Sequence, residues 1–478
     1  MTPRHSFRLI TTLLLLGALG DALLRVGPWS LNLVLWITAL SLVVLTVAVA
    51  PERRRPVGRW LLLAILFAVL TMLRDAEFLM FWNTVAVLAS LTAATLSASG
   101  LTLATARVPT FAAGGFQVAR HVAIGAVPLV TRDLAWPDQP APAEHRRRRA
   151  WAVGIVLAIP AVVVFGTLFS SADPVFARFT SWLFAWDFET LFSHAFLTGF
   201  FAWITAGYLH GLFRATTPEP VHDPLGGRAQ WITVAIPLAT VTALFAIFVA
   251  IQGTYLFGGE EWLRQSAGVG YAEYARSGFF ELVAAVTLIV PLLLGGRWLL
   301  DTRDGALRRF HVLAVALLVL VVLVAASAVW RMRLYMAAYG LTEDRLYATA
   351  FMLWIGVVLA WFAVTTLREQ GERFAFGAFV SGLALLAALT AINPDAIIAR
   401  TNLARSRAGL ELDVSYLSGL SSDAVPTVLA EWSNLTTAQQ DTLEAKLLTR
   451  ATRHVAPTDW RTWNVARRRA RAVLGERQ

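Results

Sequence analysis

The sequence predicts an all-α, polytopic integral membrane bundle that carries a small helical domain outside the membrane. Of the 478 residues, 57% are apolar and only 15% are charged, whereas an average globular chain is about 45–50% apolar. A soluble domain of this length has too little polar surface to cover so much apolar material. The apolar residues also gather in runs of the length that crosses a bilayer, which is about 20 residues in a helix.

About eleven helices are predicted to cross the membrane. Long runs without Asp, Glu, Lys, Arg or His mark the clearest of them: 26–51, 78–106, 150–172, 229–259, 312–330, 346–367 and 374–394. The others are shorter or contain an ionisable residue: 9–24, 60–73, 190–213 and 277–296. We expect Asp21, in the first of these, to pair with Arg25 one helical turn later. Residues 1–20 also fit a signal peptide, whose removal would leave one helix fewer in the same orientation.

The arginines of the short loops predict the orientation. Lys and Arg next to membrane spans are retained on the cytoplasmic side. An N-terminus inside the cell places Arg53–Arg55, Arg146–Arg149 and Arg308–Arg309 in the cytoplasm. The predicted topology is therefore N-in and C-out.

Four segments follow from this topology. We expect a four-helix membrane segment at 1–99, a cytoplasmic or interfacial connection at 100–149, a seven-helix membrane core at 150–392 and an extracytoplasmic helical domain at 393–478. The run Arg146–Arg149 has no interleaved aromatic residues. It is therefore expected to meet anionic lipids of the bilayer, and no nucleic acid partner is predicted.

The polar tail contains several helix signals. Pro394 suits a first helical turn, and Ser421 or Ser422 suits an N-cap. The last stretch places apolar residues on one face and Arg467–Arg471 on the other, a pattern that could lie on anionic lipids of the outer leaflet. The same domain could instead bind a protein partner in the envelope.

Two residue counts exclude whole classes of chemistry. Lys446 is the only lysine, which excludes P-loop and Schiff-base lysines from the membrane part. Cysteine is absent, which excludes disulfides, thiolate nucleophiles and cysteine-bound metals. His194 and His210 lack the spacing of a metal site. The sequence assigns no catalytic residue, metal or cofactor.

Tyrosines and ionisable residues gather in two hairpin loops, 255–281 and 331–347, on the predicted outer side. Each loop contains Gly-x-x-Glu and then Arg before an inward-going helix. Thr342 as a helix N-cap and tyrosines in an interfacial belt would explain the pattern structurally. Glu281 lies about one turn inside its span, where an ionisable side chain is costly to bury. It is therefore expected to be either paired, with Arg276, Arg331 or Arg333 as candidate partners, or functional. The candidate polar site comprises Asp173, Tyr271, Glu273, Tyr274, Arg276, Glu281, Arg331, Tyr335, Tyr339, Thr342 and Arg345.

Five stretches resemble a family of bacterial membrane proteins: Ser171–Phe176, Tyr271–Leu282, Arg333–Thr342, Asn393–Arg400 and Asp413–Pro426. The family is catalogued as domain of unknown function 4173. The resemblance implies one continuous membrane module with its tail in a bacterial inner membrane, and it brings no activity. A C-terminal motif of candidate residues comes from the same stretches: Asn393, Asp395, Arg400, Asp413 and Asp423.

Three functions remain open from the sequence. The polar hairpins favour transport of an ion or small solute, or sensing in the envelope, through an outward-facing polar site. A scaffold protein that uses its external domain to bind a partner is an alternative. A membrane-embedded glycosyl- or acyltransferase is another, with an acid or base among Asp173, Glu273 and Glu343, although the first external loop is short.

Overall fold

The computed structural model of the chain describes residues 3–134, 188–215, 227–267, 279–301, 305–368, 370–453 and 459–475, with Arg303 and a few positions between 151 and 176. Every regular element within these residues is a helix, and one isolated bridge joins Ala229 to Leu300. The predicted all-α class is therefore confirmed.

Ten helices of the described residues are long and apolar enough to cross a membrane. They are α1 (Pro3–Leu24), α2 (Leu31–Val43) with its π-helical extension (Val44–Ala48), α3 (Arg54–Leu73), α4 (Glu77–Ala98), α9 (Phe188–Phe213), α10 (Trp231–Ala267), α12 (Phe279–Leu299), α13 (Ala306–Tyr339), α14 (Glu343–Leu367) and α15 (Phe374–Ile392). The remaining predicted span, 150–172, lies mostly outside the described residues. The chain is thus a polytopic membrane protein.

The helices form two compact units that alternate along the sequence. Unit 1 comprises Met1–Gly27, Thr38–Ala50 and Gln117–Arg214. Unit 2 comprises Pro28–Ile37, Pro51–Phe116 and Ala215–Gln478.

Close packing of α1 on α9 organises unit 1. A Cβ atom added to Gly17 would lie 2.5 Å from the carbonyl oxygen of Thr198, so only glycine permits this approach. The predicted pair is confirmed, because Arg25 donates to Asp21 Oδ1 through Nε at 3.0 Å and Nη2 at 2.8 Å. Arg25 Nη1 also donates to Ser193 Oγ of α9 at 2.8 Å, which ties the two helices together.

A second ion pair in unit 1 joins the end of α9 to the segment that contains α6 (Ala126–Pro128) and a π-helical turn (Leu129–Asp133). Arg214 donates to the carboxylate of Asp133, and His210 Nε2 lies 3.3 Å from the same carboxylate. The hydrogen bond from Arg214 lowers the pKa of Asp133. The carboxylate is therefore ionised at neutral pH and holds the two segments together.

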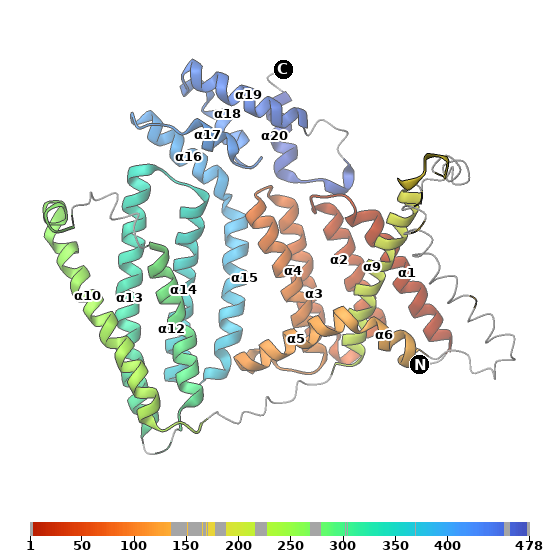
Figure 1. Cartoon of the computed structure of the whole chain (residues 1–478), viewed down its shortest axis with the longest axis horizontal. Coiled ribbons are helices and arrows are strands. Elements are labelled where there is room, and N and C mark those ends of the chain that lie inside the picture. Colours follow the sequence, from red (N-terminus) through yellow and green to blue (C-terminus); the bar gives the residue numbers. More distant parts are fainter. Residues whose placement is uncertain are drawn as a thin grey trace. The chain divides into compact units, whose positions relative to one another are not determined.

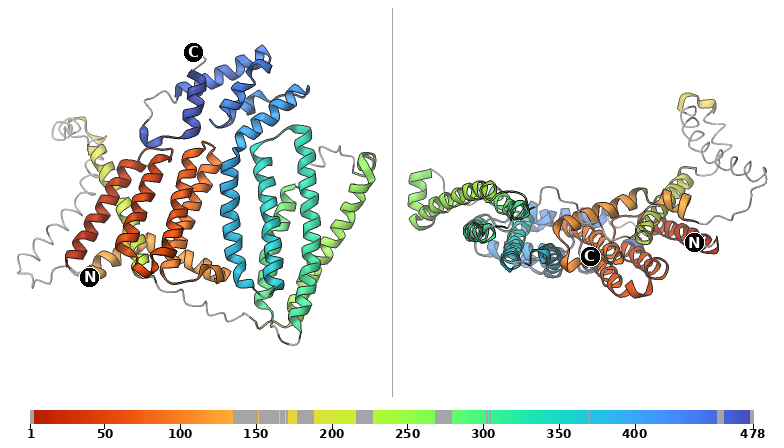
Figure 2. Two further views of the ribbon diagram at one scale, coloured as in Figure 1. Left: turned by 180° about the vertical axis from the view of Figure 1, so that it is seen from behind. Right: turned by 90° about the horizontal axis from the view of Figure 1, so that it is seen from below.

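Unit 2 contains the α3–α4 hairpin, the α13–α14 hairpin and α15, which packs on α14, α3 and α4. Figures 1 and 2 show α13, α14 and α15 side by side within this unit. An apolar core joins α10, α12, α13 and α14 around the fully buried Phe310, Leu317, Val321 and Phe362. The first half of α5 (Val108–Ile124) runs across the end of α4, with Gly114 against Leu96 (Figure 1).

Residues 393–475 belong to unit 2 and follow the end of α15 (Figure 1), and we refer to them as the C-terminal domain. It contains α16 (Pro394–Arg407), α17 (Val414–Gly419), α18 (Val425–Ala430), α19 (Thr437–Arg453) and α20 (Val465–Gly475). Asn393 adopts a left-handed conformation (φ 58°), and its side chain accepts a hydrogen bond from Ala396 N. This cap and Pro394 in the first turn start α16, as the sequence predicts.

The apolar face of the amphipathic helix α20 packs against protein. The sequence predicted that this face could lie on a lipid leaflet. Ala470 is buried in the core of the C-terminal domain, and Val473 and Leu474 pack against that core. Arg468, Arg469 and Arg471 are exposed. The domain itself therefore covers much of the apolar face. Contact of Arg467–Arg471 with anionic lipids stays a prediction.

We predict that Gly17→Val destabilises the protein by about 1–3 kcal/mol, because the added side chain must push α1 away from α9. Gly199→Val is the matched control, since Gly199 lies in α9 and has open space around its Cβ position. Both changes carry the same helix-propensity effect. Thermal unfolding in detergent micelles, followed by tryptophan fluorescence, measures the difference. Equal shifts in the two variants would contradict the packing argument.

Candidate functional site

Several predicted site residues meet at the turn between α13 and α14. The Cζ atom of Arg345 lies 3.9 Å from the centroid of the Tyr335 ring, a cation–π contact. Arg345 Nη1 donates to the carbonyl oxygens of Tyr339 at 3.2 Å and Gly340 at 2.6 Å. The rings of Tyr335 and Tyr339 lie 5.2 Å apart. The charge of Arg345 is thus used to close the C-terminus of α13.

Two residues of α16 complete this closure. Arg405 donates to the carbonyl oxygens of Ala337 and, at 3.0 Å, Ala338. The side-chain amide of Asn402 accepts from Leu341 N and donates to Leu341 O, both at 2.8 Å. Gly340 has φ 82°, and a Cβ atom there would lie 2.7 Å from Asn402 Oδ1, so the turn requires glycine. The C-terminal domain therefore fixes the position of the α13–α14 turn.

A cavity of about 470 Å³ opens beside this turn. Its lining comes from α12, α13, the start of α14 and the C-terminal domain: Phe279, Met332, Tyr335, Thr342, Glu343, Asp344, Arg345 and Tyr416. Within the described part of the chain, the side chains of Glu343 and Asp344 have no hydrogen bond or ion pair. Because Arg345 is already engaged by carbonyl groups and by the ring of Tyr335, the carboxylates of Glu343 and Asp344 are the charged groups of the lining that a ligand could bind.

Tyr416 brings the C-terminal domain into the cavity wall. Its hydroxyl accepts a hydrogen bond of 2.7 Å from the backbone N–H of Glu343. Burial raises the pKa of Tyr416 to about 12, with the nearby carboxylates Glu343, Asp395 and Asp344 acting in the same direction. The phenol therefore keeps its proton at neutral pH and can still donate it.

The other predicted site residues do not line the cavity within the described part of the chain. Glu281 is in the first turn of α12 with an exposed side chain, and Arg331 is buried in α13. Asp173 belongs to unit 1, where its Oδ1 accepts from Val175 N at 2.7 Å and forms a local turn. Four residues fall outside the described part of the chain: Tyr271, Glu273, Tyr274 and Arg276. Pairing of Glu281 with an arginine stays a prediction.

A second polar region lies where the C-terminal domain meets the α3–α4 turn. Asp423 Oδ2 accepts from Asp75 N at 2.6 Å, and Asp423 Oδ1 accepts from Arg74 Nη1 at 3.3 Å. Asp75 in turn forms an ion pair with Arg467 at 2.8 Å and accepts from Ser422 Oγ at 2.5 Å. Sequence reasoning missed Arg74 and Asp75, although two charged residues in the short turn between apolar spans are a usable signal.

Asp395 lies deepest in this region. Its side chain is fully buried, and its Oδ2 accepts a hydrogen bond of 2.9 Å from Ser421 N. Its Oδ1 has no hydrogen-bond partner among the described residues. We refer to Asp75, Asp395 and Asp423 as the carboxylate cluster. It joins the C-terminal domain to the ends of the membrane helices.

Side chains of this polar region also form hydrogen bonds with the last carbonyl groups of α15 and with a carbonyl group just after α3. Arg74 donates to the carbonyl oxygens of Thr390 at 2.6 Å and Ala391 at 2.8 Å. Asn464, next to α20, donates to Arg74 O at 2.8 Å. These bonds supply partners to carbonyl groups that a helix leaves unsatisfied at its end.

The remaining motif residues have local roles. The side chain of Asp413 accepts from Tyr416 N at 2.9 Å and caps α17. Arg400 is exposed on α16. The predicted C-terminal motif thus divides into caps (Asn393, Asp413), buried carboxylates (Asp395, Asp423) and one surface arginine.

Residues 61–430 match the model of a family described as a domain of unknown function (DUF4153). The chain belongs to this family. The number 4173 given by the resemblance is not confirmed, whereas membership in a family of uncharacterised domains is. The matched segment runs from within α3 to the end of α18 and therefore contains both the cavity and the carboxylate cluster. No curated protein and no solved structure matches the chain.

We predict that Asp423→Ala destabilises the protein by about 3 kcal/mol, because it leaves the backbone N–H of Asp75 and part of Arg74 unpaired in a buried place. Asp413→Ala, which removes only an exposed helix cap, should cost about 1 kcal/mol. Limited proteolysis and thermal unfolding in micelles measure both. An Asp423→Ala protein as stable as Asp413→Ala would contradict the assigned role of the cluster.

The carboxylate of Asp423 also predicts a pH dependence. Burial raises the pKa of Asp423, although the hydrogen bonds from Asp75 N and Arg74 lower it. The folded protein then binds this proton more tightly than the unfolded chain, so the contribution of Asp423 to stability falls as the pH rises through the raised pKa. Asp423→Asn does not titrate and should gain stability relative to wild type as the pH rises above about 4. A relative loss over the same pH range would show that the pKa is lowered instead.

Proposed function

We propose that this membrane protein is a sensor whose outward-facing cavity binds a small organic cation, and that its C-terminal domain reads the bound state. The observation that carries the proposal is the joint construction of the cavity wall. Membrane helices supply Glu343 and Asp344, whereas the C-terminal domain supplies Tyr416. A ligand in the cavity would therefore contact the membrane helices and the C-terminal domain at the same time.

The two carboxylates of the cavity support a cationic ligand. Arg345 is held by backbone carbonyl groups and by the ring of Tyr335. Glu343 and Asp344 consequently remain the groups that a ligand could neutralise. The ring of Phe279 also lines the cavity, and aromatic faces attract cations.

The packing beneath the cavity favours sensing over transport. Transporters usually bind substrate near the bilayer midplane, in a site formed by interrupted helices. Here α12, α13 and α14 pack against one another beyond the cavity. Their contact is an apolar core that includes Val286, Val321, Val324 and Ile355. Buried Arg331 lies next to the lining residue Met332, at the level of the cavity. This arrangement supports binding at one side of the membrane.

The contact between Glu343 and Tyr416 offers a route for the signal. A ligand seated against Tyr416 would alter the hydrogen bond from Glu343 N, which links α14 to α17. The helix α17 packs on α19, so a change at Tyr416 would reach the far side of the C-terminal domain. Hydrogen exchange of α16 to α19 should therefore change when the ligand binds.

We predict that spermidine, used as a polyamine probe, binds the detergent-solubilised protein and that the double variant Glu343→Gln, Asp344→Asn binds it at least about tenfold more weakly. Isothermal calorimetry measures both affinities. Glu411→Gln is the control, because Glu411 is exposed outside the cavity. It should bind as wild type does.

The outcomes separate the competing functions. Equal affinity in wild type and in the double variant would contradict binding in the cavity. Uptake of labelled spermidine into vesicles that contain the protein, with loss of uptake in the double variant, would favour transport over sensing. Altered hydrogen exchange in α16 to α19 without uptake would support the sensor.

A further inference from the structure

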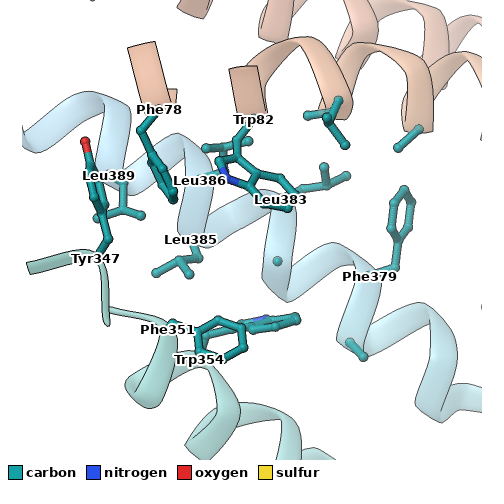
Figure 3. Close-up of a pocket in the computed structure, with 15 residues that line it drawn as sticks. Phe78, Trp82, Tyr347, Phe351, Trp354, Phe379, Leu383, Leu385, Leu386 and Leu389 are labelled. Carbon is teal, nitrogen blue, oxygen red and sulfur yellow. The ribbon is translucent and has the colours of Figure 1, made fainter. Parts of the chain in front are cut away.

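A second cavity, of about 490 Å³, lies between α4, α14 and α15. Its lining is apolar and rich in aromatic rings, as Figure 3 shows. Phe78 and Trp82 of α4 lie on one side, and Phe351 and Trp354 of α14 lie on the other. We call it the aromatic groove. All three helices are long and apolar enough to cross the membrane, so the groove adjoins lipid rather than water.

The depth of the groove matches one leaflet. Along α15 the lining runs from Ala378 to Leu389, which is roughly 16 Å at 1.5 Å per residue. The hydrocarbon core of a bilayer is about 30 Å thick, so one leaflet fills about 15 Å. Leu389 lies three residues before Ile392, where α15 ends and the C-terminal domain follows. The groove therefore belongs to the leaflet on the side of the C-terminal domain.

Small residues keep the groove open. Ala86 and Ala89 of α4 and Ala378 and Gly382 of α15 are among the residues that line the cavity. A Cβ atom at Gly382 would lie 3.3 Å from Cζ2 of Trp354, so a larger side chain there would enter the groove. The empty volume is thus a consequence of residue choice on two separate helices.

Aromatic rings mark the end of the groove nearest the C-terminal domain. Phe78 stacks on Tyr347 with ring centroids 4.0 Å apart and an interplanar angle of 22°. Phe78 and Trp82 are 42% and 43% exposed. Aromatic side chains of this kind sit at the level of lipid headgroups. A chain lying in the groove would therefore begin at headgroup depth, as the acyl chain of a phospholipid does.

Charged residues near the end of the groove closest to the C-terminal domain indicate which class of lipid headgroup would bind there. Glu77 precedes Phe78 and Asp344 comes three residues before Tyr347, and both acidic side chains are exposed. Arg345 and Arg74, the nearest basic residues in the sequence, are engaged with backbone carbonyl groups. Since both arginines are engaged, the exposed carboxylates of Glu77 and Asp344 are the groups near this end that can attract the ammonium group of a zwitterionic headgroup.

We infer that the aromatic groove binds one acyl chain of a zwitterionic phospholipid from the leaflet on the side of the C-terminal domain. This inference does not rest on the proposed sensing function. The groove and the polar cavity share no lining residue, and Asp344 of the polar cavity is used here only to attract the headgroup. Binding needs no covalent step. It requires only that the chain fill the apolar volume while the ammonium group lies beside Glu77 and Asp344.

Native mass spectrometry tests the inference on the full chain. The protein is reconstituted in nanodiscs of equal parts phosphatidylethanolamine and phosphatidylglycerol and is then released in the mass spectrometer. Wild type should retain one phosphatidylethanolamine. Gly382→Leu should reduce retention at least about tenfold, since the leucine side chain occupies the groove. Val380→Leu is the matched control on the same helix, because Val380 is 40% exposed and does not line the groove.

A second variant keeps the experiment informative if the first variant misfolds. Ala89→Leu fills the groove from α4, so it should reduce retention even if Gly382→Leu fails to fold. Gel filtration and thermal unfolding establish that each variant is folded. Retention that is equal in Ala89→Leu and Val380→Leu, preference for phosphatidylglycerol, or release of wild type without lipid would each overturn the inference.

Discussion

Burial of carboxylates at the ends of the membrane helices is the constraint on which unit 2 depends. Asp423 and Asp395 lose their contact with water and must be compensated by hydrogen bonds from Arg74, Asp75 N and Ser421 N. The bonds from Arg74 and Asp75 N fix the α3–α4 turn and the C-terminal domain against each other. Removing one partner would leave charge without compensation, which is more costly than losing the contact alone.

The start of α14 links this constraint to both cavities. Glu343 and Asp344 face the polar cavity, while Tyr347 stacks on Phe78 in the aromatic groove. Asn402 and Arg405 of the C-terminal domain hold the turn from which α14 begins. The geometry of both cavities therefore depends on how firmly the C-terminal domain is docked.

The features that could be predicted from the sequence are those that depend on the spacing of residues close together in the chain. Hydrophobic runs predicted the helices, and Asp21 with Arg25 was found because four residues place them on one helix face. Arg74 with Asp423 was missed because their contact joins residues 349 positions apart. The aromatic groove was missed for another reason: its apolar lining residues look the same in sequence as a surface that faces lipid. Amphipathicity of α20 was visible, yet only the folded domain shows that Val473 and Leu474 are covered by protein.

The residues that form the carboxylate cluster and its partners are far apart in the sequence, so they are synthesised at different times. A ribosome makes about 5–20 residues per second, so Asp423 is synthesised roughly 20–70 seconds after Arg74. Until then, the turn between α3 and α4 has charged groups without their final partners. Arg467 and Asn464 arrive later still, close to the end of translation. A truncated chain would keep its early membrane helices but lack these contacts, so quality-control proteases would meet an unprotected turn in incomplete molecules only.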